Sequence, residues 1–157
     1  MIDVKRRVFL KGSAAAGAVV AAAGAGLIAP QAVLAEWNEA AFRSKTVADA
    51  VMAQTGTDAS EESADINIKA PEIAENGAVV PVSVSSSIAG VTAISILAAS
   101  NPSPMVASFA LGEGTVADVS TRIKMGKTGD VIAVVQAGDK VYTAKKEVKV
   151  TIGGCGG

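Results

Sequence analysis

The sequence predicts a mainly β protein, an antiparallel β-sandwich that follows a short N-terminal helical segment. From Asp65 onward, apolar residues alternate with polar ones at a period of two, which is typical of half-buried strands. Turns rich in Gly, Pro, Asn and Ser separate about seven such segments, as in a sandwich. The chain ends on GGCGG, residues 153–157, which cannot pack into a core. We therefore expect a flexible C-terminal arm after the sandwich.

Residues 1–35 have the three parts of an export signal. A basic region at residues 5–12 precedes an apolar stretch rich in Ala and Gly at residues 13–29. A small-residue cleavage site, VLA, follows at residues 33–35. A basic region, an apolar region and a cleavage site in this order are typical of a signal peptide. Cleavage there would leave residues 36–157, about one ordinary domain.

The paired arginines of this signal, Arg6 and Arg7, are followed by Val-Phe-Leu-Lys and match the pattern RRxFLK. That pattern directs proteins through the twin-arginine route, which exports them folded, so we expect a periplasmic protein. The alternative is an uncleaved membrane anchor. The apolar stretch is short and rich in Ala and Gly for a bilayer core of about 30 Å. The sequence therefore predicts cleavage after Ala35 and no stable membrane anchor.

The charge and composition of the mature part exclude several classes of function. Four of the fourteen basic residues and one of the fifteen acidic residues precede Glu36, so the remainder has a net charge of −4. This balance disfavours nucleic acid as a partner. The chain has no histidine, which rules out Ser-His and Cys-His pairs and a zinc site of Cys and His type. We therefore expect no catalytic residues, no metal and no cofactor, hence no enzyme.

Residues 36–64 are expected to form the helical segment and a loop. The pattern over residues 37–54 is helical, and TVAD at residues 46–49 resembles a capping box with Thr46 as the N-cap. Gly56 fits a helix stop. The small polar residues from Gly56 to Ser63 then predict a loop.

Residues 65–152 are expected to form the sandwich. Pro81 interrupts one apparent strand, which predicts an edge strand or a bulge. The continuous apolar run at residues 130–136 favours a central strand. ENG at residues 75–77 and AGDK at residues 137–140 are typical of turns, the latter a hairpin. The alternation predicts a set of inward-facing side chains: Ile66, Ile68, Val80, Val82, Val84, Ile94, Ile96, Phe109, Leu111, Val119, Ile123, Met125, Val148, Val150 and Ile152.

The single cysteine, Cys155, lies between two pairs of glycines, Gly153 and Gly154 before it and Gly156 and Gly157 after it. Five extended residues reach roughly 16–18 Å, so this thiol could enter a narrow channel in another protein. Neither a histidine nor a helix N-terminus is near in sequence, so the thiol must be activated by the protein it visits. This pattern indicates a covalent attachment point for cargo, with the glycines providing access.

Two other uses of the tail stay open on the residues alone. Cys155 could crosslink the subunits of a periplasmic structural module through an intermolecular disulfide. Alternatively, the Gly157 carboxylate could carry sulfur as a thiocarboxylate, as in ubiquitin-like carriers. The strand-rich pattern lacks an obvious mid-chain helix, and export would separate the chain from cytosolic ATP, which disfavours the thiocarboxylate carrier.

The tail, the twin-arginine signal and the internal segment APEIAENGAVVPV, residues 70–82, together resemble the SoxY family. SoxY proteins are the sulfur-carrier subunits of the periplasmic Sox system, which oxidises thiosulfate. The resemblance spans the whole mature chain and implies an immunoglobulin-like sandwich, with Cys155 as the covalent attachment site for thiosulfate-derived intermediates.

The resemblance also implies a set of partners. A SoxZ-like subunit would form a heterodimer with this chain. A haem cytochrome complex would load Cys155, a metal-dependent hydrolase would release sulfate, and a molybdenum-haem sulfane dehydrogenase would oxidise the remaining sulfur. The SoxZ-type subunit generally lacks its own signal, which would fit export of the folded pair through the twin-arginine route.

Overall fold

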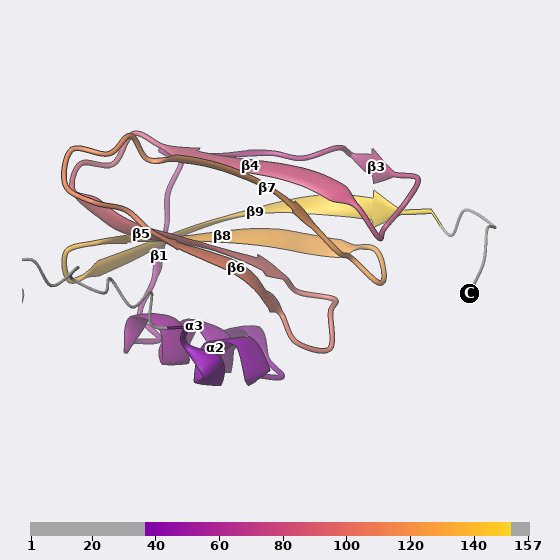
Figure 1. Cartoon of the computed structure of the whole chain (residues 1–157), viewed down its shortest axis with the longest axis horizontal. Coiled ribbons are helices and arrows are strands. Elements are labelled where there is room, and N and C mark those ends of the chain that lie inside the picture. Colours follow the sequence, from indigo (N-terminus) through magenta and orange to yellow (C-terminus); the bar gives the residue numbers. More distant parts are fainter. Residues whose placement is uncertain (1–36, 152–157) are drawn as a thin grey trace, which may run out of the picture. The chain divides into compact units, whose positions relative to one another are not determined.

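The computed structural model describes residues 37–151 (Figure 1). The expected signal peptide, with Arg6 and Arg7, and the expected arm at residues 153–157 lie outside the described residues. Ile152, the last of the expected inward-facing side chains, lies outside them as well.

The N-terminal helical segment forms two helices, α2 (Glu39–Arg43) and α3 (Val47–Thr55). Thr46 is the N-cap of α3, as predicted: its hydroxyl accepts the Asp49 N–H at 3.1 Å and donates to the Asp49 carboxylate at 2.7 Å. The extended backbone of Thr46 separates the two helices. Gly56, at φ +77°, ends α3 in the left-handed conformation that glycine adopts easily. No helix in the described part of the chain is long and apolar enough to cross a membrane.

The strands of residues 37–151 form two sheets. Their bounds are β1 (Glu61–Glu62), β2 (Ile66–Lys69), β3 (Ile73–Ala74), β4 (Val80–Ser86), β5 (Val91–Ala98), β6 (Met105–Ala110), β7 (Asp118–Ile123), β8 (Gly129–Ala137) and β9 (Lys140–Val150). The larger sheet has the order β1-β9-β8-β5-β6, with β3 also paired to β9, and the smaller sheet has the order β2-β4-β7. Figure 1 shows β4 and β7 on one side of the larger sheet and both helices on its other side. The predicted mainly β, immunoglobulin-like sandwich is confirmed.

The core between the two sheets contains the side chains that the alternation assigns to the inside. Phe109, Leu111 and Val150 are partly buried against this core. A second apolar cluster, which includes Val51, Leu97 and Val134, lies between the helices and the outer face of the larger sheet. The remaining predicted side chains are buried: Ile66, Ile68, Val80, Val82, Val84, Ile94, Ile96, Val119, Ile123, Met125 and Val148.

The burial of both faces explains the continuous apolar run in β8. Val131, Ala133 and Val135 face the smaller sheet, whereas Ile132 and Val134 contact the helix side. The strand lies between β5 and β9, so the prediction of a central strand is confirmed. A two-residue turn with Gly138 at φ +59° joins β8 to β9, as the predicted hairpin requires.

Two local predictions are wrong. Pro81 does not mark an edge strand or a bulge, because β4 is the middle strand of its sheet. Pro81 pairs with Arg122 of β7, whereas β2 pairs only with residues 83–86, so Pro81 lies beyond the end of β2. A missing N–H is tolerated where no second neighbour needs it. The expected loop at residues 56–63 contains β1, which pairs parallel with residues 142 and 143 of β9.

Candidate functional site

The expected attachment residue Cys155 and its four flanking glycines, Gly153, Gly154, Gly156 and Gly157, lie outside the described residues. Cys155 is four residues beyond Thr151, which directly follows β9. The structure therefore describes the place from which the arm starts. We call this place the arm base and define it as residues 72–77, 125–128 and 149–151.

One edge of β9 is held at the arm base by β3. The two strands pair in parallel, with Ile73 opposite Lys149 and Ala74 opposite Val150. The Lys149 N–H donates to the Glu72 carbonyl at 2.9 Å, and the Thr151 N–H donates to the Ala74 carbonyl at 3.1 Å. The last described residues of the chain are therefore tied by backbone hydrogen bonds on this edge.

The other edge of β9 is held by a side chain. The strand β8 begins at Gly129, opposite Val148, so Val150 lies beyond the end of β8. The Thr128 hydroxyl accepts the Val150 N–H at 2.9 Å and donates to the Val150 carbonyl at 3.4 Å. Thr128 therefore supplies with one hydroxyl the donor and acceptor that a continued β8 would have supplied with its backbone.

The turn at Asn76 and Gly77 connects this end of β9 to the loop after β7. The Asn76 side-chain carbonyl accepts the Ala78 N–H at 2.9 Å, and the Gly77 carbonyl accepts the Met125 N–H at 2.7 Å. A Cβ atom at Gly77 would lie 2.3 Å from the Met125 carbonyl oxygen and 2.8 Å from a methyl group of Val150. The predicted turn is confirmed, but Gly77 does not have a positive φ. Glycine is required here by close packing.

The internal segment at residues 70–82 and the end of β9 are thus one structural unit. The segment contains β3, the Asn76 turn and the start of β4, and it contacts β9 just before the tail. In Figure 1, β3 lies beside the C-terminal end of β9. Two stretches that carried the resemblance, residues 70–82 and the tail, are therefore joined through the last residues of β9. Sequence reasoning did not find this contact, because a two-residue parallel pairing leaves no periodic pattern.

The surface of the arm base carries apolar and charged side chains. Ile73 is exposed at 57%, and Val79, two residues beyond this part of the arm base, is exposed at 51%. Glu72 and Lys149 are also exposed, and neither is among the ion pairs found within residues 37–151. In the same range, no three His, Cys, Asp or Glu side chains gather closely enough to hold a metal ion. This surface can present a tethered group to another protein.

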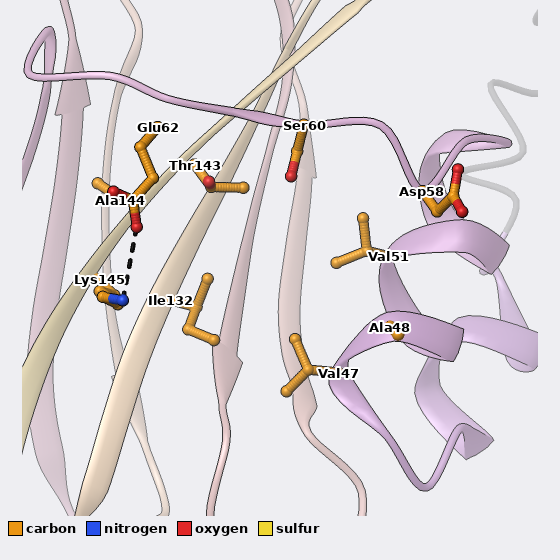
Figure 2. Close-up of a pocket in the computed structure, with 10 residues that line it drawn as sticks. All are labelled: Val47, Ala48, Val51, Asp58, Ser60, Glu62, Ile132, Thr143, Ala144 and Lys145. Carbon is orange, nitrogen blue, oxygen red and sulfur yellow. Dashed lines mark ion pairs between the residues drawn. The ribbon is translucent and has the colours of Figure 1, made fainter.

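A separate hollow of about 430 Å³ lies between α3 and the outer face of the larger sheet (Figure 2). Val47 and Val51 of α3 and Ile132 of β8 give it apolar walls. At its rim, the Lys145 ammonium and the Glu62 carboxylate form an ion pair at 3.5 Å. Periodicity alone could not reveal this pocket, because it depends on how α3 packs against the sheet. The hollow shares no residue with the arm base.

Comparison with known proteins places these features in a family. The family model described as "Sulfur oxidation protein SoxY" matches residues 51–155, a range that includes Cys155. The solved structure of the sulfur carrier protein SoxY from Chlorobium limicola f thiosulfatophilum is 55% identical. It matches with a TM-score of 0.62, covering 66% of this chain and 94% of that chain.

A superoxide reductase (neelaredoxin) from Ignicoccus hospitalis is more distantly similar, at 23% identity and a TM-score of 0.49, over 55% of this chain and 80% of that one. No curated protein matches the chain. Because the family model spans most of the chain, this protein belongs to the SoxY family, the sulfur carrier proteins of the Sox sulfur-oxidation system, and is a carrier rather than an enzyme.

Proposed function

We propose that this protein carries thiosulfate-derived intermediates covalently on Cys155 in the periplasm and presents them to partner enzymes. The observation that carries the proposal is the match to the SoxY family over a range that ends on Cys155. The geometry of the arm base supports it. β9 is held up to Thr151 on the edge that pairs with β3 and up to Val150 on the other edge, and Cys155 follows four residues after Thr151 in a run of glycines.

The chemistry of loading needs a partner that accepts electrons. A disulfide bond forms between the Cys155 sulfur and the outer sulfur of thiosulfate, while the thiol loses its proton and two electrons leave. A haem cytochrome complex can take those electrons. Water then cleaves the bond to the sulfonate group in a hydrolase, which releases sulfate and leaves a persulfide on Cys155. The covalent tether keeps each intermediate at a high local concentration for the next partner, such as a sulfane dehydrogenase.

We also propose folded export and a paired subunit. Arg6 and Arg7 match the twin-arginine pattern, which supports a periplasmic location after cleavage of residues 1–35. A SoxZ-like subunit without its own signal would travel with the folded chain as a heterodimer. Co-purification of the two subunits from the periplasmic fraction tests this point, and replacing both arginines with lysine should retain the protein in the cytoplasm.

The test of the proposed function is the intact mass of the mature protein from thiosulfate-grown cells, measured with and without a thiol reductant. We expect additions of sulfur, or of sulfur with an oxyanion, on the peptide that contains Cys155, and we expect the reductant to remove them. An unmodified thiol, or only a disulfide-linked protein dimer, would contradict the proposal and favour a structural module.

A bulky residue next to Cys155 should impair loading. We expect Gly154→Val to slow loading of the arm by about tenfold, equivalent to about 1.4 kcal/mol in activation free energy. The physical reason is that a β-branched side chain widens and stiffens a tail that must enter a narrow channel. The measurement is the rate at which the mass adduct appears, with the unfolding midpoint as the control for stability. The loading rate of Gly154→Ala should lie between the rates of the wild type and of Gly154→Val. An unchanged rate in Gly154→Val would refute an access role for the glycines.

A further inference from the structure

The end of β9 extends past its neighbour β8. Along β9, backbone groups point alternately toward each edge, so that Lys149 and Thr151 bond toward β3 while Val150 points toward β8. The last residue of β9 that pairs with β8 is Val148, opposite Gly129. β8 therefore offers no backbone hydrogen-bond partner to the N–H and the carbonyl of Val150. The Thr128 hydroxyl meets both.

We propose that Thr128 is a positioning residue that fixes the point at which the carrier arm leaves the domain and thereby sets the reach of Cys155. The inference rests on the proposed carrier function. On the opposite edge, residues 149 and 150 pair with the two-residue strand β3, and so short a pairing is marginal by itself. The hydrogen bonds from Thr128 therefore decide whether residues 149–151 stay in the sheet or become part of the arm.

The expected change in reach follows from backbone geometry. From Thr151, Cys155 is four residues away, which is at most about 14 Å of extended chain. If the chain were fixed only up to Val148, Cys155 would be seven residues away, at most about 24 Å. The local concentration of a tethered group falls roughly as the −3/2 power of tether length, which predicts about a twofold loss.

Three variants separate positioning from a general effect on stability. Thr128→Val preserves the shape of the side chain but removes both hydrogen bonds to Val150. Thr128→Ser retains the hydroxyl and should rescue every effect. Thr115→Val is the matched control, because it makes the same change at another exposed threonine. Thr115 precedes β7, whereas Thr128 follows it, so the control lies outside the arm base. Among the described residues, the Thr115 side chain has no hydrogen-bond partner.

The first readout is the position of the arm itself and needs no partner enzyme. Cys155 is the only cysteine of the chain, so a nitroxide there and a second one at Arg122→Cys, an exposed position on β7, give one distance distribution. We expect this distribution to broaden in Thr128→Val and to stay unchanged in Thr128→Ser and Thr115→Val. Amide exchange at Val150 should speed up in Thr128→Val by tenfold or more, since the amide has lost its acceptor. An unchanged distribution and an unchanged exchange rate in Thr128→Val would overturn the inference.

The second readout is loading of the arm. It is measured as the rate of adduct formation on chains without Arg122→Cys, in which Cys155 is again the single cysteine. We expect Thr128→Val to load about twofold more slowly and Thr128→Ser to load at the wild-type rate. If wild-type protein takes up no adduct at all, the proposed function fails. If wild-type protein loads and Thr128→Val loads equally fast, the positioning role fails while the carrier function stands.

Discussion

Replacing Gly77 with alanine is expected to lower the free energy of unfolding by about 2–3 kcal/mol, as overpacking of a tight contact does. The new Cβ atom would lie 2.3 Å from the Met125 carbonyl oxygen, and this backbone atom cannot move away by a change of rotamer as a side chain can. It would also press on Val150, 2.8 Å away, and so disturb the arm base from within the domain. Urea unfolding of the mature protein followed by tryptophan fluorescence and circular dichroism measures the loss.

Gly90→Ala is the matched control for this variant. Gly90 has φ +72°, and a Cβ atom added there would have no heavy atom within 4 Å, so alanine meets only conformational strain. We expect that strain to cost about 1 kcal/mol. Gly77 is the reverse case, with an ordinary backbone conformation and no space. A loss for Gly77→Ala that does not exceed the loss for Gly90→Ala would contradict the tight contact between Gly77 and Met125.

The elements that sequence predicts well are those defined by their own residues. Ile66 and Val82 are assigned to the inside because their neighbours alternate with them, and both are buried. The cap at Thr46 depends on a residue only three positions away, Asp49. The turn at Gly138 depends on a dipeptide. In each case the physical cause lies within a few residues, so a local pattern contains the information.

The elements that sequence misses are those defined by distant partners. The strands β1 and β3 are two residues long and exist only because β9 offers an open edge to each of them. Pro81 is tolerated in a middle strand because β2 ends before reaching it. The register that brings Thr128 beside Val150 results from how β8 and β9 align over their whole length. None of these relations has a signature in the residues around the position itself.

The candidate site divides in the same way. The chemistry proposed for the arm starts from the sequence, since a single thiol between glycines on a terminal tail indicates covalent attachment, with a crosslink and a Gly157 thiocarboxylate as the alternatives. The support of the arm is visible only in the structure, where β3 and Thr128 hold the end of β9 from both edges. The internal segment at residues 70–82 gains a physical role from this arrangement. Its turn packs against the strand from which the arm starts, so its sequence is constrained by the arm base.

Replacing Cys155 with serine is expected to abolish adduct formation and to reduce thiosulfate-dependent sulfate release by at least about a hundredfold, or about 2.7 kcal/mol. A hydroxyl cannot form the bond to sulfur that loading requires, and the chain has no second cysteine to replace it. Cys155 lies beyond β9, so the unfolding free energy should stay within about 0.5 kcal/mol of the wild-type value. The measurements are intact mass after incubation with thiosulfate and the loading partner, and sulfate release by the assembled system.

Cys155→Ser also distinguishes the proposed carrier from the thiocarboxylate carrier and from the structural module, because the three hypotheses predict different results for this variant. A thiocarboxylate carrier uses the Gly157 carboxylate, so it would keep its activity in Cys155→Ser and lose it when that carboxylate is blocked as an amide. For a carrier that uses the thiol, the amidated chain is the matched control and should still load, because amidation leaves Cys155 in place. A structural module would show a stoichiometric disulfide-linked oligomer on a non-reducing gel, which Cys155→Ser would remove without any sulfur adduct having been present. Only a covalent carrier on Cys155 combines loss of the adduct in Cys155→Ser with its retention in the amidated chain.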